Sequence, residues 1–363
     1  MLRKVLVNTG LIVASLFVVQ SVIGLGLRLH DGVPLFEMRN FARDYVDQFN
    51  VVKSSMYDER LGWRPKPNLR LALPVNGVLK NETTDAYGDR IADEARAAAT
   101  PGGILATGDS YTYGADVGDS ESWPAQLEAM LGAPVVNAAS RGWGTDQIVI
   151  RAEDMIGVLH PRMLIVGLYW RDIERTEQEI NFGAYKPYYT VAEGRLVLHN
   201  QPVPRLAGTV HDLGIVRGVL GYSYAAFWLA RRLALWSTFN QNRRASRPGT
   251  GREISCLLLR RLRDRAEREH IRLLLVMVYG NLDFPKPQPP TALVGVECAR
   301  GLGYETIDTW AEFAAIYRND LARFRSLYVY PNQWSHMSAA GNRLVAEALA
   351  RRLRETATAA PAR

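Results

Sequence analysis

The sequence is poor in cysteine and histidine, which narrows the chemistry that it can support. Its 363 residues include two cysteines and six histidines. Cys256 and Cys298 lack the paired spacing of a zinc site, and four of the histidines are scattered without any metal-binding pattern. We therefore expect no metal site. The cysteines would pair in an oxidising compartment, but the sequence alone favours two buried free thiols. The scattered histidines are His160, His199, His211 and His270.

The chain also lacks the basic and aromatic modules that bind nucleic acids. Its formal net charge is +7, and its arginines are spread along helix-like segments in which acidic residues intervene, as in residues 260–265. Such a pattern is typical of solvated helix faces, so we expect no nucleic-acid partner. Apolar residues make up 47% of the chain, which is ample for one large domain or two small ones.

Charge is absent from residues 5–27, which follow Arg3 and Lys4. This run is long enough to cross a bilayer as a helix, and the basic flank predicts a cytoplasmic start. Residues 21–26 offer only a poor cleavage site, so we favour an uncleaved single-pass anchor in the cytoplasmic membrane over a signal peptide. The rest of the chain would lie on the extracytoplasmic side.

A second apolar run, residues 218–230, is too short to span a membrane, and we favour an amphipathic helix packed on the domain. The alternative is that this helix lines the substrate entrance or touches the membrane surface.

Apolar runs alternate with amphipathic segments through most of the remaining sequence. This order predicts an α/β fold with three αβα layers around a five-stranded parallel sheet of the flavodoxin-like type. The predicted strands are 104–107, 134–137, 163–169, 272–279 and 304–308. The predicted helices are 123–131, 147–159, 252–269, 291–302 and 342–354.

Five segments follow from these patterns. We expect an anchor over 1–27, a connector with a small β element over 28–99, a first catalytic part over 100–172, an inserted cap over 173–251, and a second catalytic part over 252–363. The β element contains the motifs Gly62-Trp63-Arg64-Pro65 and Tyr87-Gly88-Asp89-Arg90. The cap contains a predicted hairpin over 189–198. Long insertions after a sheet strand often shape a binding site.

The strand at 104–107 ends in a turn of small residues, Gly108-Asp109-Ser110. Open α/β sheets place their ligand sites at this end of a strand. Far along the chain, His336 stands just before the last predicted helix, where it could act as the general base for a serine. The two features together favour a nucleophile and a base, Ser110 and His336.

These motifs resemble the SGNH (GDSL-type) hydrolase family. The Gly62-Trp63-Arg64-Pro65 and Tyr87-Gly88-Asp89-Arg90 motifs resemble the segment that leads into the catalytic domain in the exported, membrane-anchored branch of this family. The first block matches through Gly108, Asp109 and Ser110, with Gly114 four residues later. The second block matches through Asn137 and Gly142, and the resemblance makes Gly142 an oxyanion-hole residue together with the Ser110 backbone N–H. The third block matches at Asp172, but Arg171 stands where the family has its oxyanion-hole asparagine. Arg171 would either aim a guanidinium at the oxyanion or pair with an acid elsewhere.

The family places an aspartate two or three residues before the histidine, and this sequence has none there. Gln333 or Asn332 could orient His336 through an amide oxygen instead. Asp308, after a predicted strand, is a more distant candidate whose position favours a strand-end or capping role. Asp109 and Asp172 are expected to support the site.

The resemblance implies a serine esterase that needs no cofactor. Its substrate would be an O-acyl ester, most simply an O-acetyl group on an envelope or extracellular polysaccharide. A polysaccharide O-acetyltransferase could use the same Ser-His pair. A degenerate protein that only binds a glycan or a partner is the third alternative, because two family positions are not matched.

Overall fold

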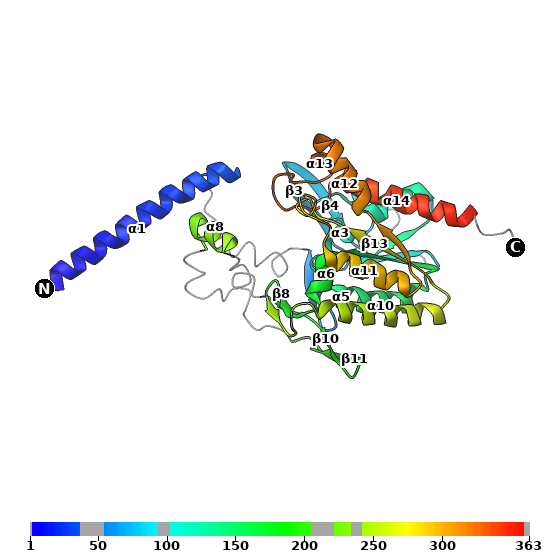
Figure 1. The fold of residues 1–363 in the computed structure, drawn as a ribbon. Helices are drawn as coiled ribbons and strands as arrows, with labels where there is room; N and C mark the ends of the chain where they lie inside the picture. The colour runs from blue at the N-terminus through cyan, green and yellow to red at the C-terminus, as the bar shows by residue number, and fades with distance from the viewer. Residues whose placement is uncertain (1, 37–53, 93–101, 205–220, 234–241, 359–363) are drawn as a thin grey trace. The chain divides into compact units, whose positions relative to one another are not determined.

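The computed structural model describes residues 2–36, 54–92, 102–204, 221–233 and 242–358. The chain divides into two units (Figure 1). One comprises Met1–Val52, Ile180–Ala184 and Arg205–Arg243, and the other comprises Lys53–Glu179, Tyr185–Pro204 and Arg244–Arg363. Much of the expected connector, residues 37–53, lies outside the described residues, as does the start of the second apolar run.

The second unit is built on a five-stranded parallel sheet, which confirms the predicted fold class. The strand order is β14-β13-β7-β5-β6, with β5 beside the central strand β7. Every residue of β7 is buried, which explains its unbroken apolar sequence, since a strand covered on both faces exposes no side chain to water. The strands are β5 (Ile104–Gly108), β6 (Val135–Asn137), β7 (Met163–Tyr169), β13 (Arg272–Val278) and β14 (Glu305–Asp308).

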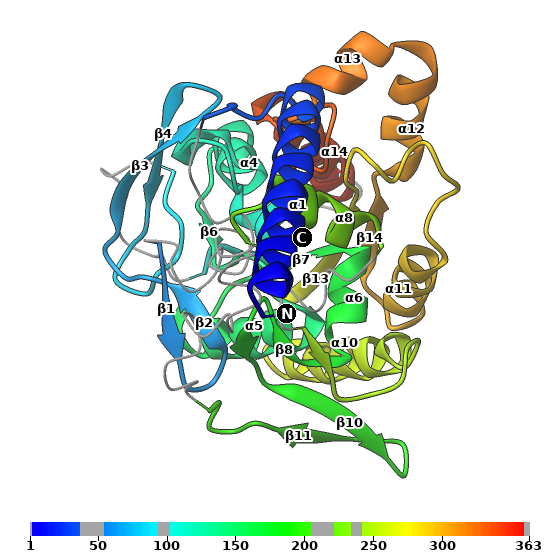
Figure 2. The same ribbon diagram turned by 90° about the vertical axis from the view of Figure 1, so that its left-hand side faces the viewer.

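Helices cover both faces of this sheet, as the two ribbon views show (Figures 1 and 2). One layer packs α10 against both α5 and α11, and the other packs α14 against α4. Two further helices, α12 (Trp310–Asn319) and α13 (Leu321–Ser326), follow β14 and were not predicted from the sequence. The layer helices are α4 (Trp123–Leu131), α5 (Thr145–Leu159), α10 (Gly251–Arg268), α11 (Pro290–Gly301) and α14 (Ala339–Thr358).

The two cysteines form a disulfide, so the preference for free thiols was wrong. Cys256 lies on α10 and Cys298 on α11, and the packing of these helices brings their Cα atoms to 5.9 Å. Their sequence separation of 42 residues carries no signal of this proximity. Tertiary packing alone creates the pair.

The small β element before the sheet consists of two hairpins. Strands β1 (Ser55–Asp58) and β2 (Gly62–Pro65) form the first, and β3 (Arg70–Val75) and β4 (Val78–Thr83) form the second. The second hairpin turns at Asn76-Gly77, where both residues have positive φ, at 48° and 76°. Asn-Gly is the preferred sequence for such a two-residue turn.

The insertion after β7 does not belong to a single unit. Residues 185–204, including the predicted hairpin of β10 (Tyr188–Ala192) and β11 (Arg195–His199), belong to the unit of the sheet. Lys186 and Asp146, both fully buried, form an ion pair that ties this segment to α5. Residues 205–243 belong to the other unit. A capping role for the insertion remains a prediction. The unit boundary passes through β8 (Gln178–Asn181), β9 (Ala184–Tyr185) and β12 (Arg243–Arg244), and α6 (Trp170–Arg175) precedes them.

The first unit contains two described helices, α1 (Leu2–Asp31) and α8 (Tyr224–Arg232). Within α1, Val7–Asp31 is long and apolar enough to cross a membrane. Tyr224 donates a hydrogen bond to Asp31 at 2.7 Å, and Ser223 donates to Gln20 at 2.7 Å. The described part of the second apolar run therefore contains a helix, as predicted, but this helix packs on α1 within the first unit, whereas we expected it to pack on the catalytic domain.

Candidate active site

Ser110 stands at the carboxyl end of β5 and begins a single helical turn, α3 (Ser110–Tyr113). Asp109 caps this turn by accepting a hydrogen bond from the backbone N–H of Tyr111 at 2.9 Å. Gly114 ends it in the left-handed conformation, with φ 78°. A Cβ at Gly108 would lie 2.6 Å from the Gly167 carbonyl oxygen, so the turn requires glycine before the serine.

His336 lies beside this serine, as the sequence predicted. Its Nε2 is 2.9 Å from Ser110 Oγ. Asn281 holds the preceding loop, because its side chain accepts from the Ser335 N–H at 3.1 Å and donates to the Gln333 carbonyl at 2.6 Å. The Tyr111 ring packs edge-on against the imidazole with centroids 5.3 Å apart. The histidine is therefore held against the serine by ring contacts from α3 and by Asn281, which fixes the loop before it.

The other ring nitrogen of His336 is held by Asp116, which sequence reasoning did not select. Nδ1 lies 2.6 Å from Asp116 Oδ2. The prediction that Gln333 or Asn332 orients the ring was wrong, because both are exposed on the loop before the histidine while the nitrogen faces the loop after α3. Asp308 accepts hydrogen bonds from Tyr279 and Gln288 and has the strand-end role that its position favoured.

Asp116 is an ionised carboxylate at neutral pH. Burial alone would raise its pKa, but the charges of His336, Arg141 and Arg90 outweigh burial and lower the pKa below its usual value of 3.8. Its side chain is 35% exposed, so water still reaches one edge of the carboxylate. The carboxylate can therefore stabilise an imidazolium on His336.

A weak sequence signal for Asp116 did exist. It is an acid six positions after Ser110, between Gly114 and Gly118. Since Gly114 ends the helix after one turn, the residues that follow remain close to the serine. The resemblance places the acid just before the histidine, so Asp116 was not predicted.

Gly142 lies in the loop that follows β6 and has φ 72° in the left-handed region. Contacts on both sides hold this loop: the Arg141 carbonyl accepts from the Trp63 indole at 2.8 Å, and the Trp143 carbonyl accepts from Arg175 at 3.0 Å. An oxyanion-hole role for Gly142 remains a prediction. Arg171 is placed otherwise. Its Nε lies 3.3 Å from the Tyr169 hydroxyl and its guanidinium stacks 4.3 Å from the Trp170 ring, a pairing that the sequence did not predict.

Asp109 and Asp172 share one buried cation below the serine turn. Arg175 Nη1 lies 2.5 Å from Asp172 and 3.4 Å from Asp109. Burial, followed by the neighbouring charge of Asp109, raises the pKa of Asp172 well above its usual value.

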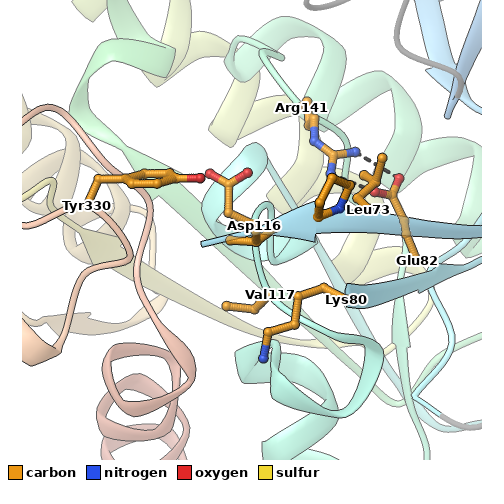
Figure 3. A pocket seen from close by; sticks show the side chains of 9 residues that line it. Leu73, Lys80, Glu82, Asp116, Val117, Arg141 and Tyr330 are labelled. Carbon is orange, nitrogen blue, oxygen red and sulfur yellow. Dashed lines mark hydrogen bonds and ion pairs between the residues drawn. The ribbon is translucent and has the colours of Figure 1, made fainter. Parts of the chain in front are cut away.

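A pocket borders the outer edge of Asp116 (Figure 3). In this view the Tyr330 hydroxyl points toward the Asp116 carboxylate, and Arg141 is paired with Glu82 on the opposite wall. Lys80 is likewise neutralised, at 2.7 Å from Glu121. The pocket thus combines paired charges with an apolar wall. It is lined by Leu73, Pro74, Val75, Lys80, Glu82, Asp116, Val117, Arg141 and Tyr330.

Comparison with known proteins finds no matching family model and no matching curated sequence. Solved structures do match. A protein described as lipolytic and of the G-D-S-L family, from Desulfitobacterium hafniense, is 16% identical with a TM-score of 0.36, covering 68% of this chain and 97% of its own. An acetylxylan esterase from Geobacillus stearothermophilus is 14% identical with a TM-score of 0.40, covering 70% and 94%. The TesA structure is 12% identical with a TM-score of 0.38, covering 68% and 94%. One of these structures carries the G-D-S-L description of the family that the motifs of this chain resemble, and at these identities the matches do not specify a reaction.

Proposed function

We propose that this chain is a serine esterase in which Ser110 is the nucleophile, His336 the general base and Asp116 the acid that supports it. The observation that carries the proposal is the continuous hydrogen-bonded chain from Ser110 Oγ to His336 Nε2 at 2.9 Å and from His336 Nδ1 to Asp116 Oδ2 at 2.6 Å. A nucleophile, a base in contact with it and a third group orienting the base together form the arrangement that activates a serine hydroxyl.

The geometry supports a two-step reaction. Ser110 Oγ attacks the ester carbonyl while its proton passes to His336 Nε2, and Asp116 stabilises the resulting imidazolium. The tetrahedral intermediate collapses, the alcohol leaves with the proton from Nε2, and an acyl group stays on Ser110. Water then attacks this acyl-enzyme while His336 Nε2 takes its proton. The second tetrahedral intermediate collapses, the proton passes from Nε2 to Ser110 Oγ as its bond to the acyl carbon breaks, and the carboxylic acid is released.

The oxyanion of the tetrahedral intermediate needs hydrogen-bond donors beside the serine. We assign this role to the backbone N–H groups of Ser110 and Gly142, which belong to two adjacent loops at the carboxyl ends of β5 and β6. Arg171 is not required, because its guanidinium is engaged with Tyr169 and Trp170.

The finer proposal is an O-acyl ester, with acetyl as the simplest acyl group, on a carbohydrate outside the cytoplasm. The pocket beside Asp116 supports an uncharged alcohol portion, since the two cations that line it are paired with acids and one wall is apolar. The apolar N-terminal helix supports a membrane-anchored location. The disulfide between α10 and α11 supports an oxidising compartment.

The test is hydrolysis of an aryl acetate by the full chain purified in detergent. We expect turnover by the wild type and a loss on the order of 10⁴-fold or more in Ser110→Ala and His336→Ala. Matched controls are Ser255→Ala, a buried serine of α10, and His270→Asn, an exposed histidine at positive φ that asparagine tolerates. A folded wild type without turnover, or variants as active as the controls, would refute the proposal.

A further inference from the structure

Arg90 ends the Tyr87-Gly88-Asp89-Arg90 motif and is almost fully buried, at 4% exposure. Its backbone N–H donates to the Asn137 carbonyl at 2.9 Å, so it lies directly against β6 of the main sheet. Its side chain extends beyond the β element and contacts the loop that carries Asp116.

The Arg90 guanidinium collects carbonyl groups from both sides of Asp116. Nη1 donates to the Tyr113 carbonyl at 2.9 Å and also to the Gly114 carbonyl, and Nη2 donates to the Val117 carbonyl at 2.6 Å. Nε lies 3.3 Å from the carboxylate of Asp119, which in turn accepts from the Thr83 N–H at 2.9 Å. The guanidinium of Arg90 therefore binds the loop on both sides of Asp116.

This loop needs such support because it is irregular and strained. Asp116 has φ 66°, in the left-handed region that non-glycine residues rarely adopt. Buried carbonyl groups outside regular structure also require donors. The planar fork of arginine offers five N–H groups in fixed directions, whereas lysine offers one compact charge and cannot reach the same set.

We propose that Arg90 is a positioning residue that holds Asp116 in line with His336. The inference rests on the proposed function and extends it to a residue of the segment before β5, which belongs to the same unit as the sheet but to neither motif that carries the serine and the histidine. An acid on the histidine loop would be placed by the same segment as the base. Here the acid comes from a different loop, so its alignment depends on Arg90.

The alternative is that Arg90 only stabilises the fold. A double-mutant cycle separates the two, because a residue that acts through Asp116 loses its effect on catalysis once Asp116 is replaced. A matched control is Arg151→Lys. Arg151 is also a buried arginine that pairs with a carboxylate, Asp89, and donates to a carbonyl, that of Tyr87, and neither partner belongs to the Asp116 loop.

The experiment uses the full chain in detergent and measures kcat and KM for an aryl acetate, the melting temperature, and the downfield proton resonance of the His336–Asp116 hydrogen bond. We expect Arg90→Lys to lower kcat by about 10²-fold with little change in KM, as a displacement of about 1 Å can do, and to shift the resonance. In the Asp116→Asn background the same substitution should change kcat less than about twofold. Arg151→Lys should lower the melting temperature without either effect.

Two results would overturn the proposal: Arg90→Lys matching Arg151→Lys in kcat and resonance, or an equal loss of kcat in the presence and absence of the Asp116 carboxylate. If Arg90→Lys fails to fold, Asp119→Asn keeps the guanidinium but removes the carboxylate partner of Nε, and a smaller loss that vanishes in the Asp116→Asn background is expected. If the wild type is inactive, the resonance still decides: a shift specific to Arg90→Lys keeps the positioning role while the esterase function fails.

Discussion

Replacing Asp116 by asparagine should disable catalysis without unfolding the protein. The carboxylate accepts a hydrogen bond from His336 Nδ1 at 2.6 Å, and its low pKa keeps it charged. An asparagine could present its amide NH₂ to the ring, which would favour the tautomer with the proton on Nε2. Such a ring cannot take the proton of Ser110. Even with the amide oxygen turned inward, the charge that stabilises the imidazolium is lost.

The magnitude follows from comparable triads, in which an aspartate-to-asparagine change lowers kcat about 10⁴-fold, or about 5.5 kcal/mol in activation free energy. Because the Asp116 side chain is 35% exposed, water can replace part of the lost stabilisation, so we expect about 10³- to 10⁴-fold here. The assay is steady-state hydrolysis of an aryl acetate with Asp264→Asn, on the surface of α10, as the control. An Asp116→Asn enzyme within about threefold of the wild type would refute the assignment.

Moving the acid to the histidine loop gives a second test of the role assigned to Asp116. Gln333 occupies the position where the family carries its aspartate, but it is exposed and its carbonyl is held by Asn281. Gln333→Asp should therefore not rescue Asp116→Asn. Restored turnover would mean that the histidine is oriented from its own loop.

Three further predictions follow from the same structure. Gly142→Ala should lower kcat by about 10²- to 10³-fold and leave KM little changed. The reason is that φ 72° disfavours a side chain, so the backbone donor to the oxyanion would shift. An unchanged kcat would show that Gly142 does not stabilise the oxyanion. Burial raises the pKa of Glu82, but the charge and hydrogen bonds of Arg141 outweigh burial and lower this pKa from 4.5 to about 2. The ion pair therefore contributes about 3 kcal/mol to the free energy of unfolding. This contribution is present above pH 4.5 and is lost as the pH falls toward 2. Unfolding at pH 7 and pH 3 should accordingly show a smaller pH dependence for Glu82→Gln than for the wild type, and equal dependence would contradict the pairing. Replacing Cys256 and Cys298 by serine opens a 42-residue loop and should cost about 3–4 kcal/mol in denaturant unfolding, whereas an unchanged midpoint would argue against the disulfide.

The elements that the sequence predicted are those encoded locally. The central strands β7 and β13 appear because their apolar runs are almost continuous. The Gly108-Asp109-Ser110 turn appears because each residue meets a local need: no Cβ, a capping carboxylate and a hydroxyl that can reach His336. The position of His336 was predictable for a related reason. A histidine just before the last helix of such a sheet lies at the carboxyl ends of the strands.

The features that were missed depend on distant partners. Asp116 reaches His336 only because Gly114 turns the chain and Arg90, from the β element, holds the loop. Arg171 turns to Tyr169 and Trp170, a choice set by side-chain packing rather than by its place in a motif. The disulfide likewise needs two helices to pack side by side.

The most direct test of the central claim is to locate a covalent adduct. The full chain in detergent would be treated with a fluorophosphonate, digested, and the modified peptide sequenced by mass spectrometry. The account predicts one adduct, on Ser110, that is absent in His336→Ala and strongly reduced in Asp116→Asn. A folded protein that acquires no adduct, or acquires it on another residue, would contradict the claim that Ser110, His336 and Asp116 form a working catalytic site.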